Sequence, residues 1–258
     1  MNLNRNKKVG LGLVMLIALG AVAALLNHGP ISQPLSYHGF ADRSVIWGIP
    51  HFFDVLSNIP FVLVGLLGLY KTSRKDGINI ITENRVSYKV FFIGVALVGV
   101  GSGYYHLAPS NTTLVWDRIP MTIAFMALSS IIIGEFTSIR FGSILLLPLV
   151  LFGVLSVLYW HWTEVAGQGD LRPYILVQFL PMLVIPVLLV CFNSEFTRVS
   201  GYWLLLSAYV IAKLLEHFDT EMHGATSFVS GHSLKHVVAA IGIYILLLSF
   251  GRRRSTQK

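Results

Sequence analysis

Two short polar segments hold the residues whose types and spacing could do chemistry. The first lies between two long apolar stretches and contains Ser102, His106 and Asp117. The second, Gly-His-Ser-Leu-Lys-His, lies far along the chain and contains His232 and His236. Ser102 and His106 are four residues apart, as are His232 and His236. Because side chains four apart share one face of an α-helix, each pair would point the same way.

Three histidines with a nearby carboxylate are a set typical of a catalytic zinc site. Such a site has three protein ligands and leaves a fourth position to water. Zinc lowers the pKa of that water to about 7, which gives a hydroxide nucleophile at neutral pH. We therefore predict Zn²⁺ as the cofactor, with His106, His232 and His236 as its ligands. Asp117 would take or guide the proton of the water, and Ser102 would hydrogen-bond the water or the developing oxyanion.

Each residue also has a purely structural interpretation. A His-x-x-x-His pair is only moderately specific for a metal. Ser102 could bond to a carbonyl within its own helix, and Asp117 could pair with Arg118 or cap a helix. The metal site is favoured because residues from three separate helices are expected at one membrane depth.

The composition indicates that membrane helices position these residues. Of 258 residues, 54% are apolar and only 12% are charged, against about 25% charged in a soluble domain. Long apolar runs with so little charge predict an all-α polytopic membrane protein. The net charge of +7 comes from basic clusters between these runs, which topology explains without a nucleic-acid partner. The single cysteine, Cys191, excludes an intramolecular disulfide and a cysteine metal cluster.

Eight runs are long enough to span a bilayer, since roughly 20 helical residues cross its core. The first could instead be a cleaved signal peptide, because Ala21-Val-Ala23 resembles a cleavage site; we expect a retained helix, since the run is long for a signal sequence. The predicted spans are 9–26, 50–70, 88–106, 118–136, 141–160, 173–192, 201–215 and 232–250.

Basic residues indicate the orientation of these spans. With eight crossings, the N-terminus, the loop 71–89, Arg140, Arg198 and the C-terminal tail lie on one side, which is cytoplasmic by the positive-inside rule. Both termini are therefore expected in the cytoplasm, and the two polar segments on the extracytoplasmic side. The predicted organisation is an N-terminal helix or signal anchor (1–27), an extracytoplasmic loop (28–49), a seven-helix domain (50–250) and a basic tail (251–258).

The order Ser102-x-x-x-His106, Asp117 and His232-x-x-x-His236 resembles the alkaline ceramidase family, in its bacterial branch. That family belongs to a superfamily of seven-helix membrane hydrolases that includes the adiponectin and progestin receptors. The resemblance covers residues 50–250 and includes the segment Asp54-Val-Leu-Ser-Asn. It implies a zinc-dependent amidase that cleaves ceramide-like lipids to a fatty acid and a sphingoid-type base, with the same five residues as ligands and catalytic groups.

The sequence also departs from the eukaryotic members of that family. Those members bind calcium through an Asp-Trp-x-Glu segment and a later glutamate, where this chain has Asp42-Arg43 and His51. We therefore predict no calcium site. A further set of charged residues resembles the bacterial branch and could either shape the substrate entrance or pair at the surface. This set comprises Glu164, Asp170, Arg172, Lys213, Glu216 and Asp219.

Three functions compete at this point. The first is a lipid amide hydrolase of a bacterial inner membrane, with its active site toward the extracytoplasmic side and a membrane lipid as partner. The second is a receptor or sensor with a structural zinc and a bound lipid. The third is a transporter, which the polar residues within the spans alone suggest. Ceramide and other N-acyl lipids stay open as substrates.

Overall fold

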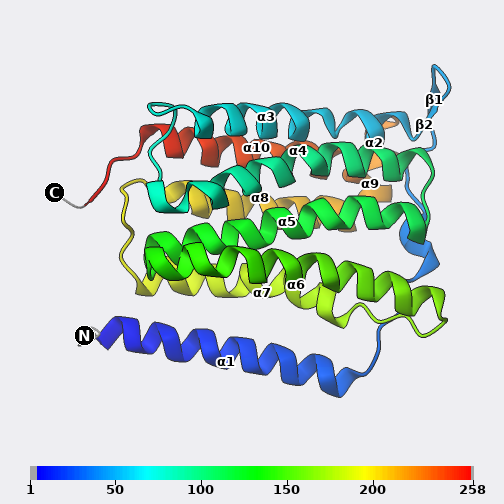
Figure 1. Ribbon diagram of the computed structural model, residues 1–258. Coiled ribbons are helices and arrows are strands. Elements are labelled where there is room, and N and C mark those ends of the chain that lie inside the picture. The colour runs from blue at the N-terminus through cyan, green and yellow to red at the C-terminus, as the bar shows by residue number, and fades with distance from the viewer. Residues whose placement is uncertain (1–4, 257–258) are drawn as a thin grey trace.

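The structure, a computed structural model, describes residues 5–256 as a bundle of long, roughly parallel and antiparallel helices (Figure 1). Residues 1–4 and 257–258 of the predicted terminal segments lie outside the described residues. The α-helices are α1 (Arg5–His28), α2 (Phe52–Leu56), α3 (Ile59–Ser73), α4 (Arg85–Leu107), α5 (Asn111–Phe136), α6 (Ile139–Val165), α7 (Arg172–Cys191), α8 (Ser200–His217), α9 (Asp219–Thr226) and α10 (Gly231–Arg252).

Short elements complete the chain at the two ends of the bundle. They are the 3₁₀ helices η1 (Leu35–His38) and η2 (Thr82–Asn84) and the strands β1 (Val45–Ile46) and β2 (Ile49–Pro50). The two strands pair antiparallel, with Val45 opposite Pro50. They form a small hairpin that projects from the end of the bundle opposite the termini (Figure 1).

Seven helical segments are long and apolar enough to cross a membrane, and the all-α polytopic membrane fold is thereby confirmed. The remaining predicted span, 201–215, corresponds to α8, which packs against α10 inside the bundle. It is not among the seven because Lys213, Glu216 and His217 make its last turns polar. The seven are α1, the segment Phe52–Ser73, the segment Thr82–Leu107, α5, α6, α7 and α10.

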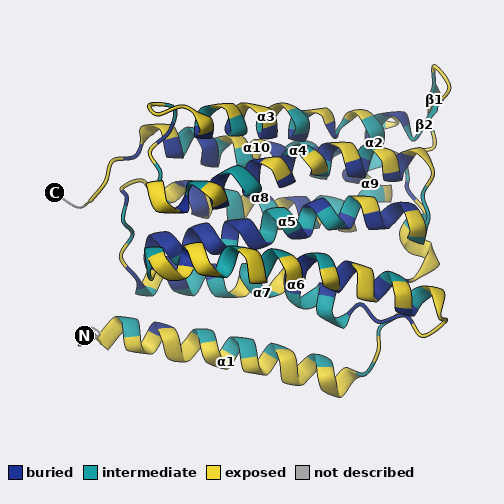
Figure 2. Cartoon of the chain, in the orientation of Figure 1, coloured by how far each residue is buried: buried dark blue, intermediate teal, exposed yellow. Residues whose placement is uncertain are grey.

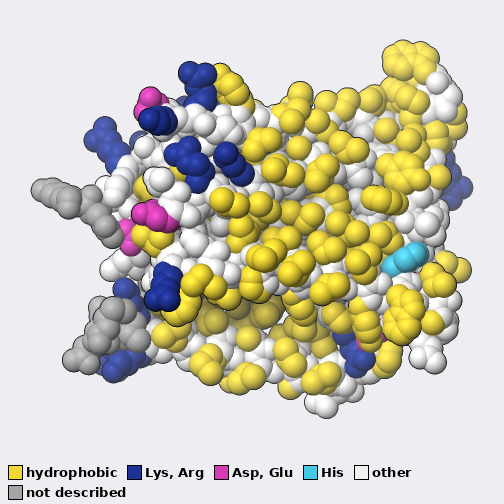
Figure 3. All heavy atoms as spheres, viewed as in Figure 1, with side chains coloured by type: hydrophobic (Ala, Val, Ile, Leu, Met, Phe, Trp, Pro, Cys, Tyr) yellow, Lys and Arg dark blue, Asp and Glu magenta, His cyan; other side chains and the backbone are white. Residues whose placement is uncertain are grey.

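The surface agrees with a membrane environment. Apolar side chains cover the middle of the visible face, and most Lys and Arg side chains on that face gather at the end that holds both termini (Figure 3). Exposed residues lie along the outer sides of the helices, and buried ones face the bundle interior (Figure 2). The helix α1 is the most exposed, since only 6% of its apolar window is buried. It rests on α7, where Gly10 meets Cys191 and Phe192.

The predicted span 50–70 is interrupted in the structure. Helix α2 ends at Leu56 and α3 begins at Ile59, with Ser57 and Asn58 between them. Pro60 explains the break, because its ring has no N–H and clashes with the carbonyl of the residue four positions earlier. The Asn58 side chain donates to the Asp54 carbonyl at 2.8 Å, so a side chain satisfies one of the groups that the break leaves free.

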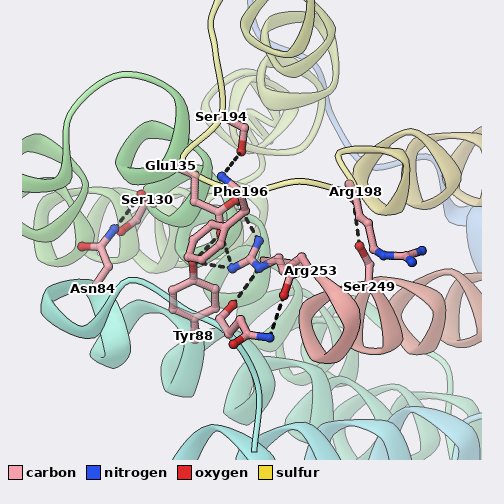
Figure 4. A network of polar contacts seen from close by, with 10 residues as sticks. Asn84, Tyr88, Ser130, Glu135, Ser194, Phe196, Arg198, Ser249 and Arg253 are labelled. Atoms are coloured by element: carbon pink, nitrogen blue, oxygen red, sulfur yellow. Dashed lines mark hydrogen bonds and ion pairs between the residues drawn. The ribbon is translucent and has the colours of Figure 1, made fainter. Parts of the chain in front are cut away.

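A buried ion pair connects α5 to the segment after α10, at the end of the bundle opposite the hairpin (Figure 4). Arg253 follows α10, and its guanidinium contacts the Glu135 carboxylate of α5 at 2.7 and 2.9 Å. Tyr88 donates to the same carboxylate, and the Phe196 ring centroid lies 3.8 Å from the guanidinium carbon. Burial alone would lower the pKa of Arg253, but Glu135 outweighs it and raises that pKa above its ordinary value. The arginine therefore stays charged.

Replacing Arg253 with methionine should strongly destabilise the fold. The substitution leaves the Glu135 carboxylate buried without its partner, and breaking a buried pair in this way costs about 3–5 kcal/mol. Thermal unfolding of detergent-solubilised protein would measure the loss. Arg252→Met is the matched control, because Arg252 is exposed at the neighbouring position. Equal melting temperatures for the two variants would contradict a stabilising role for the pair.

Candidate active site

The three predicted histidines meet at one end of the bundle. His106 lies in the last turn of α4, and His232 and His236 lie in the first turns of α10; all three are at most 5% exposed. The His106 ring centroid is 4.8 Å from that of His232 and 5.2 Å from that of His236, and the latter two are 4.9 Å apart. One ligand atom from each residue lies within 4.8 Å of the others, so the group could hold a metal ion.

Local structure explains where the α10 histidines stand. The Ser230 hydroxyl accepts from the Ser233 N–H at 2.9 Å and caps the helix. The His232 N–H donates to the Asp219 carboxylate at 2.7 Å, which satisfies another free group of the first turn. A Cβ on Gly231 would lie 2.1 Å from the Leu215 carbonyl oxygen, so glycine lets α8 and α10 approach closely here.

Hydrogen bonds orient His236. Its Nδ1 lies 2.8 Å from the Ser57 hydroxyl, which itself donates to the Asp54 carbonyl at 2.9 Å. Since the hydroxyl proton is used on that carbonyl, the His236 Nδ1–H donates to Ser57. Nε2 is then the unprotonated nitrogen that faces the cluster and can act as a metal ligand.

The donor set fits a metal ion. The His106 Nδ1 is buried and has no hydrogen-bond partner, which is costly for a polar atom unless something else binds it. The Phe40 ring stands 4.5 Å from the His106 and His232 rings and covers them from the loop before α2. Neutral imidazoles in such a water-poor place are ligands that zinc accepts.

Replacing Ser57 with alanine should weaken metal binding. The substitution removes the acceptor that fixes the His236 ring, and loss of such a partner typically lowers metal affinity about 10- to 100-fold. Competition with a chromophoric zinc chelator would measure the affinity. Ser73→Ala, an exposed serine near the far end of α3, is the control and should bind zinc like the unmodified protein. An unchanged affinity for Ser57→Ala would show that Ser57 does not position the ligand.

Asp117 and Ser102 lie beside the histidines. The Ser102 side chain lies close enough to the Asp117 carboxyl to interact with it, and both residues line the same cavity as His236. Ser110, not Asp117, caps α5, in a capping box with Thr113. Asp117 therefore stands in the second turn of α5, facing the cavity.

The neighbouring Arg118 is engaged elsewhere. Its Nη2 donates to Gln33 at 2.6 Å, and its guanidinium carbon lies 4.3 Å from the Trp160 ring centroid and 4.5 Å from that of Tyr174. Within residues 5–256, no ion pair joins Arg118 to Asp117. Within the described residues, Asp117 therefore neither pairs with Arg118 nor caps a helix.

The cavity extends from this polar end along the bundle axis. It is lined mainly by side chains of α4, α5, α7, α8 and α10, most of them apolar, with Phe61 of α3 and Tyr37 of η1 completing the lining. On α5 the lining runs from Asp117 to Ile132, which are fifteen positions apart and therefore about 22 Å apart along the helix. Helices α7 and α8 both line it but make few contacts with each other, whereas α8 packs closely on α10. The cavity wall is therefore least tightly packed between α7 and α8.

The other charged residues of the sequence divide into two groups. Glu164 accepts from the Trp160 indole, and Asp170 pairs with Arg172 at 2.8 Å, a contact that lowers the pKa of Asp170. These three residues lie where α6 ends and α7 begins, and they do not line the cavity described above. Glu216 does line it, paired with Lys213 and Lys235, and Asp219 holds the start of α10.

Sequence reasoning missed three contributors to the site. Lys235 stands inside the histidine motif itself, so its position was visible although its role was not. Ser57 belongs to the unusually polar start of its span, which was the available signal. Phe40 carries no sequence signal, since only the folded loop brings its ring onto the histidines.

The fold and the site together define an integral membrane protein with a histidine cluster, able to hold a metal ion, at the polar end of an apolar cavity. A comparison with protein families matches residues 44–258 to the ceramidase family. The chain therefore belongs to the ceramidase family, and the resemblance found in its motifs is confirmed at that level. Membership implies a hydrolase that acts on amide bonds and takes a lipid substrate. No match was found among curated proteins.

Proposed function

We propose that this protein is a zinc-dependent intramembrane amidase that removes the acyl chain from ceramide-like lipids. The products would be a free fatty acid and a sphingoid-type base. One observation carries the proposal: three buried histidines converge with Asp117 and Ser102 at the polar end of a long apolar cavity.

His106, His232 and His236 would hold the zinc ion. When bound, zinc supplies a nucleophilic water near neutral pH and polarises the amide carbonyl. The ring of His236 is held for this task by Ser57, and Phe40 limits the access of bulk water to His106 and His232. The buried, unbonded Nδ1 of His106 supports its assignment as a ligand.

Asp117 would carry the proton through the reaction. Its carboxylate takes a proton from the water that attacks the amide carbon, and later gives that proton to the nitrogen as the carbon–nitrogen bond breaks. The leaving amine and the carboxylic acid are then both neutral products of one water. Ser102 is 2% exposed and lies beside Asp117 in the cavity lining, where its hydroxyl would help to orient the carboxyl and could donate to the developing oxyanion.

The cavity supports a lipid substrate. Its lining along α5 spans about 22 Å. The hydrocarbon core of a bilayer is roughly 30 Å thick, and one acyl chain covers about half of that depth. The cavity is therefore long enough to hold an acyl chain. Its sparse packing between α7 and α8 favours lateral entry from the membrane. An acyl chain would then lie along α5, with the amide at Asp117.

The charge distribution supports an orientation. On the face seen in Figure 3, most Lys and Arg side chains gather at the end that carries both termini, whereas the histidines lie in the last turn of α4 and the first turns of α10, at the opposite end of α10 from the C-terminus. By the positive-inside rule the end that carries both termini faces the cytoplasm. In a bacterial inner membrane the active site would therefore open toward the extracytoplasmic side, at the level of the lipid headgroups.

Metal analysis of the purified protein combined with a mass-spectrometric screen of lipid amides tests this function. We expect about one zinc per chain and release of fatty acid from at least one N-acyl lipid. Treatment with a strong chelator should abolish the release, and added zinc should restore it. Stoichiometric zinc and lipid binding without turnover of any amide would favour a receptor or sensor instead. Absence of metal would contradict the proposal as a whole.

A further inference from the structure

The cavity wall next to the histidine cluster carries two lysines and one glutamate, here called the cationic triad: Lys213, Glu216 and Lys235. The Glu216 carboxylate accepts from Lys213 at 2.6 Å and from Lys235 at 2.5 Å. Lys213 and Glu216 come from the last turns of α8, and Lys235 comes from α10. All three line the cavity.

The triad has one more cation than it has anions. Two ammonium groups share a single carboxylate, and partly buried charges are costly when they lack a counter-charge. Lys213 and Lys235 keep 36% and 19% of their side chains accessible, so an anion entering the cavity could reach them. The other cavity carboxylate, Asp117, belongs to the histidine cluster. A divalent cation bound there would add two positive charges, so the site as a whole is cationic.

The triad also stands where a lipid headgroup would lie. Lys235 is three residues after His232 and directly before His236, at the outer end of α10. Asp117 and Tyr37, the latter in η1, line the same cavity. Lys213 borders the sparsely packed α7–α8 wall, with its Nζ 5.9 Å from the Phe179 ring centroid of α7.

We propose that the cationic triad is a headgroup subsite for N-acyl lipids whose amine half carries a single anionic group, such as a sulfonate or a carboxylate. The orientation of the lipid rests on the proposed function: the amide lies at the histidines, the acyl chain lies along α5, and the headgroup lies at the triad. A single anionic headgroup would pair with the second lysine. The two lysines would then face two anions, Glu216 and the headgroup. A neutral headgroup would leave the excess cation without a partner.

Binding of matched lipids to the full-length, zinc-loaded protein tests this subsite. The two probes share the same chains and a hydrolysis-resistant urea in place of the amide; one ends in a hydroxyl and the other in a sulfonate. We expect the sulfonate probe to bind about tenfold more tightly or better, because hydrogen bonds to charged groups contribute about 1.5–3 kcal/mol each. Isothermal titration calorimetry would give both dissociation constants.

Substitution then assigns the preference to the triad. Lys235→Gln and Lys213→Gln each remove one cation and still leave Glu216 one partner, so the fold is retained. Each should bring the sulfonate-to-hydroxyl affinity ratio close to one. Lys75→Gln is the control, because Lys75 is exposed in the loop after α3, at the opposite end; it should keep the full ratio.

The outcomes separate this inference from the proposed function. Equal affinity of the wild type for both probes, or an unchanged ratio in both lysine variants, would overturn the headgroup subsite even if the protein hydrolyses ceramide. Conversely, a sulfonate preference that depends on Lys213 and Lys235 supports the subsite whether or not any amide is cleaved, because the probes need no turnover.

Discussion

Replacing His106 with glutamine should eliminate both zinc retention and amide hydrolysis. The imidazole is buried between Phe40 and the two α10 histidines, and its unbonded nitrogen has no other task within the described chain. Glutamine has a similar reach but is a poor zinc ligand. A catalytic metal lowers the activation barrier by several kcal/mol, so its loss corresponds to a rate decrease of about 10³-fold or more.

Metal content by elemental analysis and fatty-acid release by mass spectrometry would check this prediction on the same preparation. His217→Gln is the matched control, because His217 is exposed at the same end of the molecule, at the end of α8. It should retain zinc and full activity. If His106→Gln kept one zinc per chain, the three-histidine assignment would be wrong.

Replacing Asp117 with asparagine should suppress hydrolysis while leaving the metal in place. Asparagine is nearly the same size and can still interact with the neighbouring Ser102, but it cannot accept and return a proton. General acid–base groups contribute about 10²- to 10⁴-fold to the rate, and we expect a decrease in that range. Zinc should stay bound, because Asp117 is not one of the three proposed ligands.

Single-turnover release of fatty acid together with zinc analysis distinguishes a proton carrier from a ligand. Asp76→Asn, an exposed aspartate in the loop after α3, is the control and should hydrolyse at the wild-type rate. Zinc loss in Asp117→Asn would reassign Asp117 as a ligand. An unchanged rate with zinc retained would remove it from proton transfer altogether.

Helical periodicity explains why much of the site is predictable from the sequence. Four residues make about one helical turn, so the spacing alone pairs Ser102 with His106 and His232 with His236. Counting apolar runs then brings both pairs to the same end of the bundle. The count works although α8 is less apolar than the other spans, because its apolar middle still forms a helix of the bundle that packs on α10.

Contacts between side chains of different helices are beyond such reasoning. The sequence predicts a continuous span over 50–70, whereas the structure breaks it beside Pro60, and that break turns Ser57 toward His236. The pairing of Lys235 with Glu216 depends on how close Gly231 lets α8 and α10 come. Neither contact is encoded in a local pattern, because each requires the relative placement of two elements.

The ion pair between Glu135 and Arg253 has a consequence for the opposite end of the molecule. Helix α5 carries Asp117 near its start and Glu135 near its end, while α10 carries the histidines at its start and precedes Arg253. The two helices do not pack on each other along their length. Asp117 and Glu135 are eighteen residues apart on α5, about 27 Å. The ion pair thus sets the axial register of two helices that meet across a cavity. A slip of one residue, about 1.5 Å, would move Asp117, the proposed proton carrier, away from the histidines.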